Sequence, residues 1–563
     1  MLLKIDGRDI IANPGETLLS LIQRLNLDNG GFAQRPIAAK IAGEVFNLNY
    51  VPVRDENSER MSIRKAMAAS NGNVSLIRYD DPVGKDVYVR TTQFIMFLAL
   101  HILHPGARVK MNCMVGKALY VEVYTDSFSA SALKEKVLQL VSADIPLVRE
   151  RVSLEKAIEH YRQMGQLDKA ELLKYRNQDY FDQYSYGDFS DYYYGELAPS
   201  TGYMQVWDVL PAEGGFIFVY PDDNLPSNVA VIEQMPNLLQ VCEESERWCE
   251  LMECQTVSDL NAFIKDGRIR ELVRVNEALH EKRFSQIADT VCEKEIKVVM
   301  LAGPSSSGKT TSANRLATQL RVHGKKPVMM SLDDYYLDRN QIVPGPDGKL
   351  DLEHINTIDT ELFGKHMEQL LSGETISLPT FDFKTGKRIW NGHALKMTND
   401  TVIIVEGLHA LNPQLLPMEL DRNLVFKLYV SPLIPLNLDD HNRIPTSLLR
   451  LLRRTVRDYN TRGASVQRTM EMWDSVRKGE KIWIFPYQEE ADAILNSSTL
   501  YEIAVLKKYI YPLLIEVQPE DSAYEQVRGM VKILNYVCEA DVESEIPPTS
   551  LVREFIGGNS YYQ

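Results

Sequence analysis

The start of the chain carries short apolar runs separated by turn residues, a pattern typical of small mixed α/β units. One segment after Thr17, a residue that can cap a helix, has apolar residues at helical spacing. We therefore expect residues 1–62 to fold as a β-grasp-like unit. The expected elements are strands at Leu2–Ile5 and Ile10–Ala12, a helix at Leu18–Leu25, and strands at Ile37–Ile41 and Val45–Leu48.

Residues 63–225 mix helical and strand patterns and are expected to form an α+β unit. Thr92–Leu103 is strongly apolar but shorter than the ~20 residues of a membrane-spanning helix, so it predicts a buried helix. A strand is expected at Ala118–Tyr124 and one long charged helix around Leu154–Tyr175. We expect a following group of tyrosines to fill a sheet face or domain interface, with stacking on bases as the alternative. They are Tyr180, Tyr184, Tyr186, Tyr192, Tyr193, Tyr194 and Tyr203.

Residues 226–285 have polar helical faces and predict a helical connector. From Glu295 onward, continuous apolar runs alternate with helical segments, which is typical of a parallel sheet buried on both faces. Residues 286–563 are therefore expected to form an α/β unit, and the chain as a whole is multidomain. The apolar runs are Ile296–Ala302, Pro327–Leu332, Thr401–Val405 and Leu424–Val430.

Composition narrows the classes of function. The 563 residues are 44% hydrophobic and 25% charged, which is ordinary for globular proteins. A net charge of -15 argues against a nucleic acid as the main partner. The six cysteines form no CxxC pair and are too sparse for a disulfide framework. The N-terminus has no signal-peptide pattern, so we expect a cytoplasmic protein without a membrane segment.

The strongest chemical signal runs from Gly303 to Thr310, which matches the phosphate-loop pattern G-x-x-x-x-G-K-[ST] in full. An apolar run precedes it, and a helix is expected at Thr310–Val322 with its N-terminus facing a bound anion. In such loops the backbone N–H groups and the lysine bind phosphates, and the last hydroxyl binds Mg²⁺. The expected ATP-binding residues are Gly303, Pro304, Ser305, Ser306, Ser307, Gly308, Lys309, Thr310 and Thr311.

Carboxylates end two further apolar runs. Asp333, beside Asp334, follows the second run, and Glu406 follows the third. Ligands of open α/β sheets bind at the carboxyl ends of strands, so both acids should lie beside the phosphate loop. We expect Asp333 to accept the proton of an attacking hydroxyl, and Glu406 to hold Mg²⁺ with Thr310. A turn-starting acid pair and a solvated strand end are the alternatives.

A later segment is rich in arginine. Arg450, Arg454 and Arg457 recur at i, i+4 and i+7 and would share one helix face, with Arg453 and Arg462 nearby. A mobile helix of this kind can close over transferring phosphates as a charged lid. The alternative is a solvated basic face.

The C-terminal half resembles the uridine kinase family, which is close to the phosphoribulokinases. The phosphate loop, DDYY, LPTFDFK, VEG and RRTVRD occur in that family's order over residues 295–500. The resemblance implies that Asp333 is the catalytic acid, and that Arg457 and Arg462 act with Lys309 on the transferring phosphoryl group. It also implies a set of acceptor-binding residues, which are Tyr336, Glu353, Phe381, Phe383 and Arg454.

Some positions depart from the family's pattern. Gly386 stands where the family has a base-contacting His, Ala464 where it has an Arg, and Met472 where it has a Gln. Glu353 replaces a sugar-binding Asp. Since a site that loses buried polar partners loses discrimination for its substrate, these changes put uridine itself in doubt.

The N-terminal half resembles the front of threonyl-tRNA synthetase, with a TGS domain at 1–62 and an editing-type domain beyond it. HPGARV, YGDFSD and PSTG carry the second resemblance, which spans residues 85–210. The family's four metal-binding positions fall on Arg90, Phe94, Tyr193 and Leu197, none of which can take that metal. The resemblance implies a retained scaffold for regulation, dimerisation or substrate delivery.

Together the motifs predict an ATP-dependent, Mg²⁺-requiring kinase whose acceptor is the 5′-OH of a nucleoside such as uridine or cytidine. A kinase of another alcohol or sugar, and a non-catalytic nucleotide- or RNA-sensing regulator, are the alternatives. We expect a small-molecule partner and no membrane, and homo-oligomerisation stays open. The apolar residues of the C-terminal segment 546–558 predict that it packs onto the kinase unit.

Overall fold

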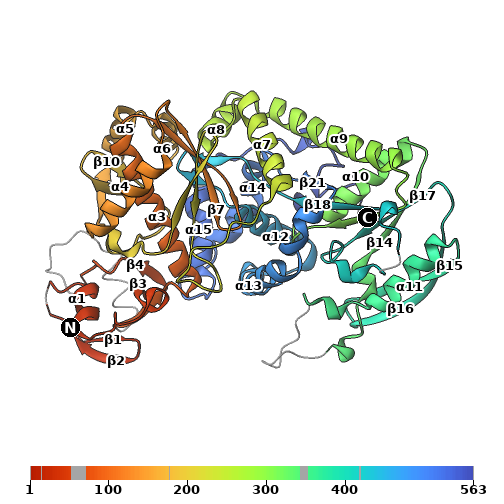
Figure 1. The fold of residues 1–563 in the computed structure, drawn as a ribbon, viewed down its shortest axis with the longest axis horizontal. Coiled ribbons are helices and arrows are strands. Elements are labelled where there is room, and N and C mark those ends of the chain that lie inside the picture. The colour runs from red at the N-terminus through yellow and green to blue at the C-terminus, as the bar shows by residue number, and fades with distance from the viewer. Residues whose placement is uncertain are drawn as a thin grey trace.

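The computed structural model describes residues 2–13, 15–51, 72–176, 178–342, 353–417 and 420–561. In Figure 1 the N-terminal elements lie at one end, and the hairpin β15 (Thr375–Asp382)–β16 (Lys387–Lys396) lies at the other with α11 (Thr360–Leu371). Between them lie three helices drawn in blue, which are α12 (Thr446–Arg462), α13 (Val466–Trp483) and α15 (Tyr524–Leu534). No helix within the described ranges has the length and apolar character needed to cross a membrane.

The first sheet has the strand order β2-β1-β5-β3-β4 and covers helix α1. Its last strand in sequence, β5, lies beyond the boundary expected at residue 62, which itself falls outside the described residues. Thr17 caps the helix by accepting the Ser20 N–H at 3.0 Å, as expected. The elements are β1 (Leu2–Ile5), β2 (Arg8–Ile11), α1 (Leu18–Arg24), β3 (Pro36–Ile41), β4 (Glu44–Phe46) and β5 (Asn73–Arg78).

The next unit contains two antiparallel sheets, ordered β10-β9-β8 and β11-β12-β7-β6. Its central helix α3 begins at Pro82, ten residues before the expected start, because its first three turns are more polar than the rest. The elements are α3 (Pro82–Leu103), β6 (Arg108–Val115), β7 (Ala118–Tyr124), α4 (Ala130–Ser142), β8 (Arg149–Ser153), α5 (Leu154–Gln163), α6 (Leu167–Leu173), β9 (Tyr180–Tyr186), β10 (Phe189–Asp191), β11 (Asp208–Ala212) and β12 (Gly215–Val219).

The structure differs from one expectation for this unit and agrees with another. The single long helix expected over Leu154–Tyr175 is wrong, because the chain breaks at Gly165 with φ +75° and forms α5 and α6 instead. Among the tyrosines, Tyr184 and Tyr192 are each 2% exposed. Tyr184 packs inside the unit, whereas Tyr192 packs at the interface with the C-terminal half and donates to Asp439 Oδ2 at 2.5 Å, and both agree with the structural role.

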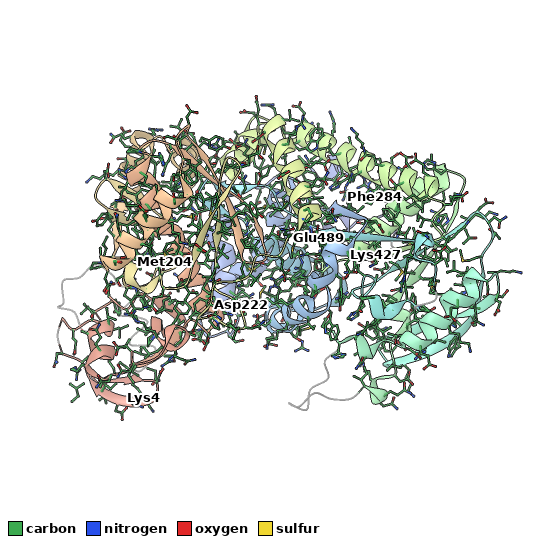
Figure 2. All side chains as sticks on the ribbon, in the orientation of Figure 1. Lys4, Met204, Asp222, Phe284, Lys427 and Glu489 are labelled. Atoms are coloured by element: carbon green, nitrogen blue, oxygen red, sulfur yellow. The ribbon has the colours of Figure 1, made fainter. Side chains whose placement is uncertain are left out.

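The connector consists of α7 (Pro236–Leu251), α8 (Val257–Lys265) and α9 (Ile269–Glu293), and α9 continues past the boundary expected at residue 285. Phe284 of α9, labelled in Figure 2, is fully buried with Leu316 of α10 (Lys309–Val322) on the outer face of the C-terminal sheet. The connector therefore also covers one face of the C-terminal sheet.

The C-terminal sheet is parallel, with the order β14-β17-β13-β18-β21, as the apolar runs predict. Every residue of β13 is buried, because helices cover both faces. The strands are β13 (Val298–Ala302), β14 (Lys326–Ser331), β17 (Thr401–Glu406), β18 (Val425–Ser431) and β21 (Ala493–Asn496), with hairpins β15 (Thr375–Asp382)–β16 (Lys387–Lys396) and β19 (Asn437–Asp439)–β20 (Asn442–Arg443). The other helices are α11 (Thr360–Leu371), α12 (Thr446–Arg462), α13 (Val466–Trp483), α14 (Glu502–Ile515), α15 (Tyr524–Leu534) and α16 (Arg553–Ile556).

A buried polar network joins the two halves at the β19–β20 hairpin. Lys169 Nζ donates to Asp191 at 2.6 Å and lies 2.8 Å from His441 Nδ1. The His441 ring stacks on Phe97 with 3.7 Å between ring centroids. Since α12 begins three residues after this hairpin ends, the N-terminal half is attached to the start of the arginine helix.

Candidate active site

The phosphate loop connects β13 to α10 at the carboxyl end of the sheet. A Cβ at Gly303 would lie 2.2 Å from the Val430 carbonyl oxygen, so only glycine fits. Gly308 caps α10 with φ +87°, which glycine adopts freely. Lys309 Nζ folds back and donates to the carbonyl oxygens of Gly303 and Pro304, at 2.9 and 3.1 Å.

Arginines of α12 donate hydrogen bonds to this loop. Arg450 Nε donates to the Ser305 carbonyl at 2.9 Å, and Arg453 Nη1 donates to the Ser306 carbonyl at 3.4 Å. Arg454 Nη1 donates to Ser305 Oγ at 2.8 Å. These hydrogen bonds hold the loop through the carbonyl oxygens of Ser305 and Ser306 and the Ser305 hydroxyl.

The arginine helix is anchored at these positions, which differs from the mobile lid suggested by the sequence. Arg453 pairs with Glu502 at 2.7 Å, and both side chains are fully buried. Arg450 pairs with Glu480, which also accepts the Ser305 N–H at 3.0 Å. Amphipathic spacing does not reveal these buried acids, because they come from α13 and α14.

Glu406 and Thr310 lie side by side, as expected for residues that share a metal ion. Thr310 Oγ1 donates to Glu406 Oε1 at 3.3 Å, and Ser331 Oγ donates to the same oxygen at 3.4 Å. Burial raises the Glu406 pKa to about 7, against the opposing charge of Lys309. Thr310 offers a hydroxyl oxygen, and Glu406 offers a buried carboxylate whose charge is only partly balanced. Oxygen donors of this kind suit Mg²⁺. The described residues contain no group of three or more His, Cys, Asp or Glu that could hold a metal alone, so phosphate and water oxygens would complete the site.

The two acids after β14 have different surroundings. Burial raises the Asp333 pKa, while the nearby positive charges of Lys309 and Arg462 oppose that shift. Asp334 instead accepts the Phe381 N–H at 3.1 Å, which ties this turn to β15. Asp333 is therefore the acid whose field reaches the phosphate loop, whereas Asp334 has a structural contact.

Aromatic side chains gather beside Asp333. The rings of Tyr336, Phe381 and Phe383 lie with 5.1 to 6.3 Å between centroids. Phe381 is 8% exposed, but Phe383 is 56% exposed and presents an open ring. Glu353 contributes to the electrostatics of both Tyr336 and Arg454, so the structure brings the five expected acceptor residues together.

Gly386, the position where the resembled family has a histidine, has φ +67°. A Cβ there would lie 2.5 Å from Arg339 Cδ, and Arg339 Nη2 donates to the Phe383 carbonyl at 2.8 Å. A larger side chain at this position would have to displace Arg339 and adopt a left-handed backbone, so glycine fits best here.

The outer arginines of α12 are paired with acids. Arg457 Nη2 and Arg462 Nη1 both lie 3.2 Å from Asp458 Oδ1, and the Arg462 side chain is 58% exposed. Arg457 Nη1 also lies 3.9 Å from Oε1 of Glu554, in the C-terminal segment.

That segment was expected only to pack on the kinase unit, and the structure confirms this with Leu551 and Phe555 buried at 0% and 1% exposure. Glu554, however, also accepts a hydrogen bond from Thr311 Oγ1 at 2.7 Å. Sequence reasoning missed this residue, because no motif marks a lone acid 243 residues from its partner.

In the N-terminal half, the four positions that correspond to the synthetase metal site are packed with protein. Phe94 and Leu197 are fully buried, and Arg90 Nε donates to the Glu196 carbonyl at 3.1 Å. The Tyr193 ring lies 6.5 Å from that of Phe94.

Comparison with known proteins gives a family for the C-terminal half. Residues 298–504 match the model of the phosphoribulokinase / uridine kinase family. The uridine kinase of Aliivibrio salmonicida is 31% identical over 223 residues, which cover 38% of this chain and 94% of that protein. The threonine–tRNA ligase of Desulforamulus reducens is 24% identical over 207 residues, covering 36% of this chain and 30% of that protein. A solved structure described as a possible uridine kinase from Bacillus stearothermophilus is 18% identical with a TM-score of 0.26, covering 38% of this chain and 97% of that one. Through its C-terminal half, the chain belongs to the phosphoribulokinase / uridine kinase family.

Proposed function

We propose that the protein is an ATP-dependent kinase that transfers the γ-phosphoryl group to a hydroxyl of a small molecule. The observation that carries the proposal is the convergence of Lys309, Asp333 and Glu406 at the carboxyl ends of three adjacent parallel strands. Burial lowers the Lys309 pKa, while Glu406 and Asp333 are the two largest influences that raise it. The three groups therefore share one electrostatic site.

Each group has a role in this chemistry. Lys309 exchanges the loop carbonyls for the β- and γ-phosphate oxygens, and the N-terminus of α10 faces the same anion. Mg²⁺, held by Thr310 and Glu406, would offset charge on the bridging phosphate oxygens. Asp333 accepts the proton of the attacking hydroxyl, and its raised pKa suits that role because the carboxylate is a stronger base.

Arg457 and Arg462 stabilise negative charge on the transferring group. Both are bound to Asp458 in this structure, so they would exchange a carboxylate for phosphate oxygens during the reaction.

For the acceptor we propose a nucleoside 5′-OH, such as that of uridine or cytidine. The exposed face of Phe383, beside Phe381 and Tyr336, suits a planar base. Glu353 and Arg454 would bind the sugar hydroxyls. Because Gly386 supplies no polar side chain to the base, we expect weak discrimination between pyrimidines, and the kinase of another alcohol or sugar is the alternative acceptor class.

For the N-terminal half we propose TGS-like and editing-like domains that no longer edit. The partial similarity to a threonine–tRNA ligase supports this, and the buried Phe94 and Leu197 agree with a lost metal site. A second candidate function follows from that similarity, namely a nucleotide- or RNA-sensing regulator that transfers no phosphoryl group. We propose a cytoplasmic location for either.

A substrate panel tests the proposal. Purified protein with Mg·ATP is given nucleosides, sugar phosphates and polyols, and ADP release is measured with each. We expect turnover with one acceptor class, and a loss of several powers of ten in kcat for Lys309→Ala or Asp333→Asn. Turnover at the wild-type rate in either variant would remove this site from the mechanism. Absence of product with every acceptor, together with tight RNA binding, would favour the regulator.

A further inference from the structure

The segment Ile546–Asn559 lies outside the residues that match the family, 298–504, and packs against the phosphate loop. Ser550 Oγ donates to Glu277 Oε1 of α9 at 2.6 Å. Arg553 Nη2 donates to the Ile546 carbonyl at 3.0 Å, and the Arg453 guanidinium lies 4.9 Å from the Phe555 ring centre. These contacts hold α16 in place.

One side chain of this segment reaches the anion-binding groups of the loop. Glu554 Oε2 accepts the Thr311 hydroxyl at 2.7 Å, and Oε1 lies 3.9 Å from Arg457 Nη1. Thr311 is in the first turn of α10, and the dipole of that helix favours an anion at this end. The Thr311 hydroxyl also accepts a hydrogen bond from Asn559 Nδ2 at 3.3 Å.

The carboxylate therefore binds the groups that a nucleotide phosphate would use. Its charge also reaches Lys309 and Glu406, whose pKa values it raises. A side chain whose only role was to fix α16 would not need to lie at the helix N-terminus, because Ser550 and Arg553 already anchor the segment.

We propose that Glu554 is a further residue of the nucleotide site, where its carboxylate takes the place of a nucleotide phosphate and lowers the affinity for the phosphate donor by competing with it. This inference rests on the proposed function, since it assumes that a nucleotide binds the loop. When the nucleotide binds, the Glu554 side chain turns away while the anchored backbone of α16 stays. Two anions held at contact distance repel strongly in a poorly solvated site, so both cannot occupy it.

The test compares nucleotide binding by the full chain and by Glu554→Gln, using calorimetry with Mg²⁺ present. The probes are AMP-PNP, ADP and adenosine. We expect Glu554→Gln to bind AMP-PNP and ADP about tenfold more tightly, because the amide carries no charge. Adenosine, which has no phosphate, should bind both proteins equally.

A matched control lies one residue before this segment. Glu545 pairs with Arg274 at 2.9 Å on the surface of α9, so Glu545→Gln removes the same charge and should leave all three affinities unchanged. If Glu554→Gln does not fold, Glu554→Asp keeps the charge but shortens the reach to Thr311, and should tighten AMP-PNP binding by a smaller factor.

The outcomes separate the two hypotheses. Equal or weaker AMP-PNP binding by Glu554→Gln would overturn the inference, as would a gain in affinity that adenosine shares. A wild-type protein and a variant that both fail to bind any nucleotide would instead refute the proposed function.

Discussion

Glu406 gives a prediction that separates function from stability. Its pKa rises from an ordinary 4.5 to about 7, chiefly because it is buried. Between pH 4.5 and about 7, the folded protein therefore keeps a proton on Glu406 that the unfolded chain has released. Stability consequently falls as the pH rises through this window and then levels off above pH 7.

Glu406→Gln keeps the shape and the acceptor oxygen for Thr310, but it has no charge to desolvate. A shift of this size corresponds to about 3 kcal/mol, so at pH 8 the metal-free variant should be the more stable protein by up to that amount. At pH 4.5 the two proteins should have similar stability, because Glu406 is then protonated in the folded state and half protonated in the unfolded chain, which leaves only a small difference. Catalysis should be lost at every pH, since the amide cannot replace the charged metal ligand.

The assay is scanning calorimetry of both proteins from pH 4.5 to 8.5 in the presence of a chelator. For a unit of this size, the expected gain in Tm at pH 8 is on the order of 5–10 °C. Asp400→Asn, at an exposed turn, is the control and should show no pH-dependent difference. A constant difference in Tm between wild type and Glu406→Gln across the whole range would refute the reasoning, and so would a less stable variant at pH 8.

Three further changes have clear expected results. Asp333→Asn should lower kcat by at least about a hundredfold while AMP-PNP affinity, measured by calorimetry, stays within about threefold, because a base acts only in the chemical step. Phe383→Ala should raise KM for the acceptor with little change in Tm, since the ring is 56% exposed; an unchanged KM would remove it from the acceptor site. Glu502→Gln should cost about 3–5 kcal/mol of stability in urea unfolding, because Arg453 is left charged and fully buried, and replacing both residues with apolar ones should cost less than either single change.

Local patterns in the sequence were sufficient to predict most of the strands that build the C-terminal sheet. The run at Thr401–Val405 becomes β17, and the glycines at both ends of the phosphate loop occupy positions where φ or a close carbonyl demands glycine. Each of these features depends on residues a few positions apart, so periodicity and turn chemistry predict them. The break in the helix expected over Leu154–Tyr175 was missed for a related reason, because the helical pattern continues on both sides of Gly165.

The parts of the site that sequence did not predict depend on long-range contacts. A row of arginines has the same spacing whether it faces solvent, phosphate or buried acids, and only the fold shows that Glu502 and Glu480 neutralise Arg453 and Arg450. Charges this deeply buried require partners, so the arginines and their acids form part of the loop's support. This division explains why α12 begins with fixed arginines and ends with Arg462, whose side chain is 58% exposed. The helix therefore combines a buried part that supports the phosphate loop with an exposed end, where Arg462 pairs with Asp458, and the proposed nucleotide contact belongs to that exposed end.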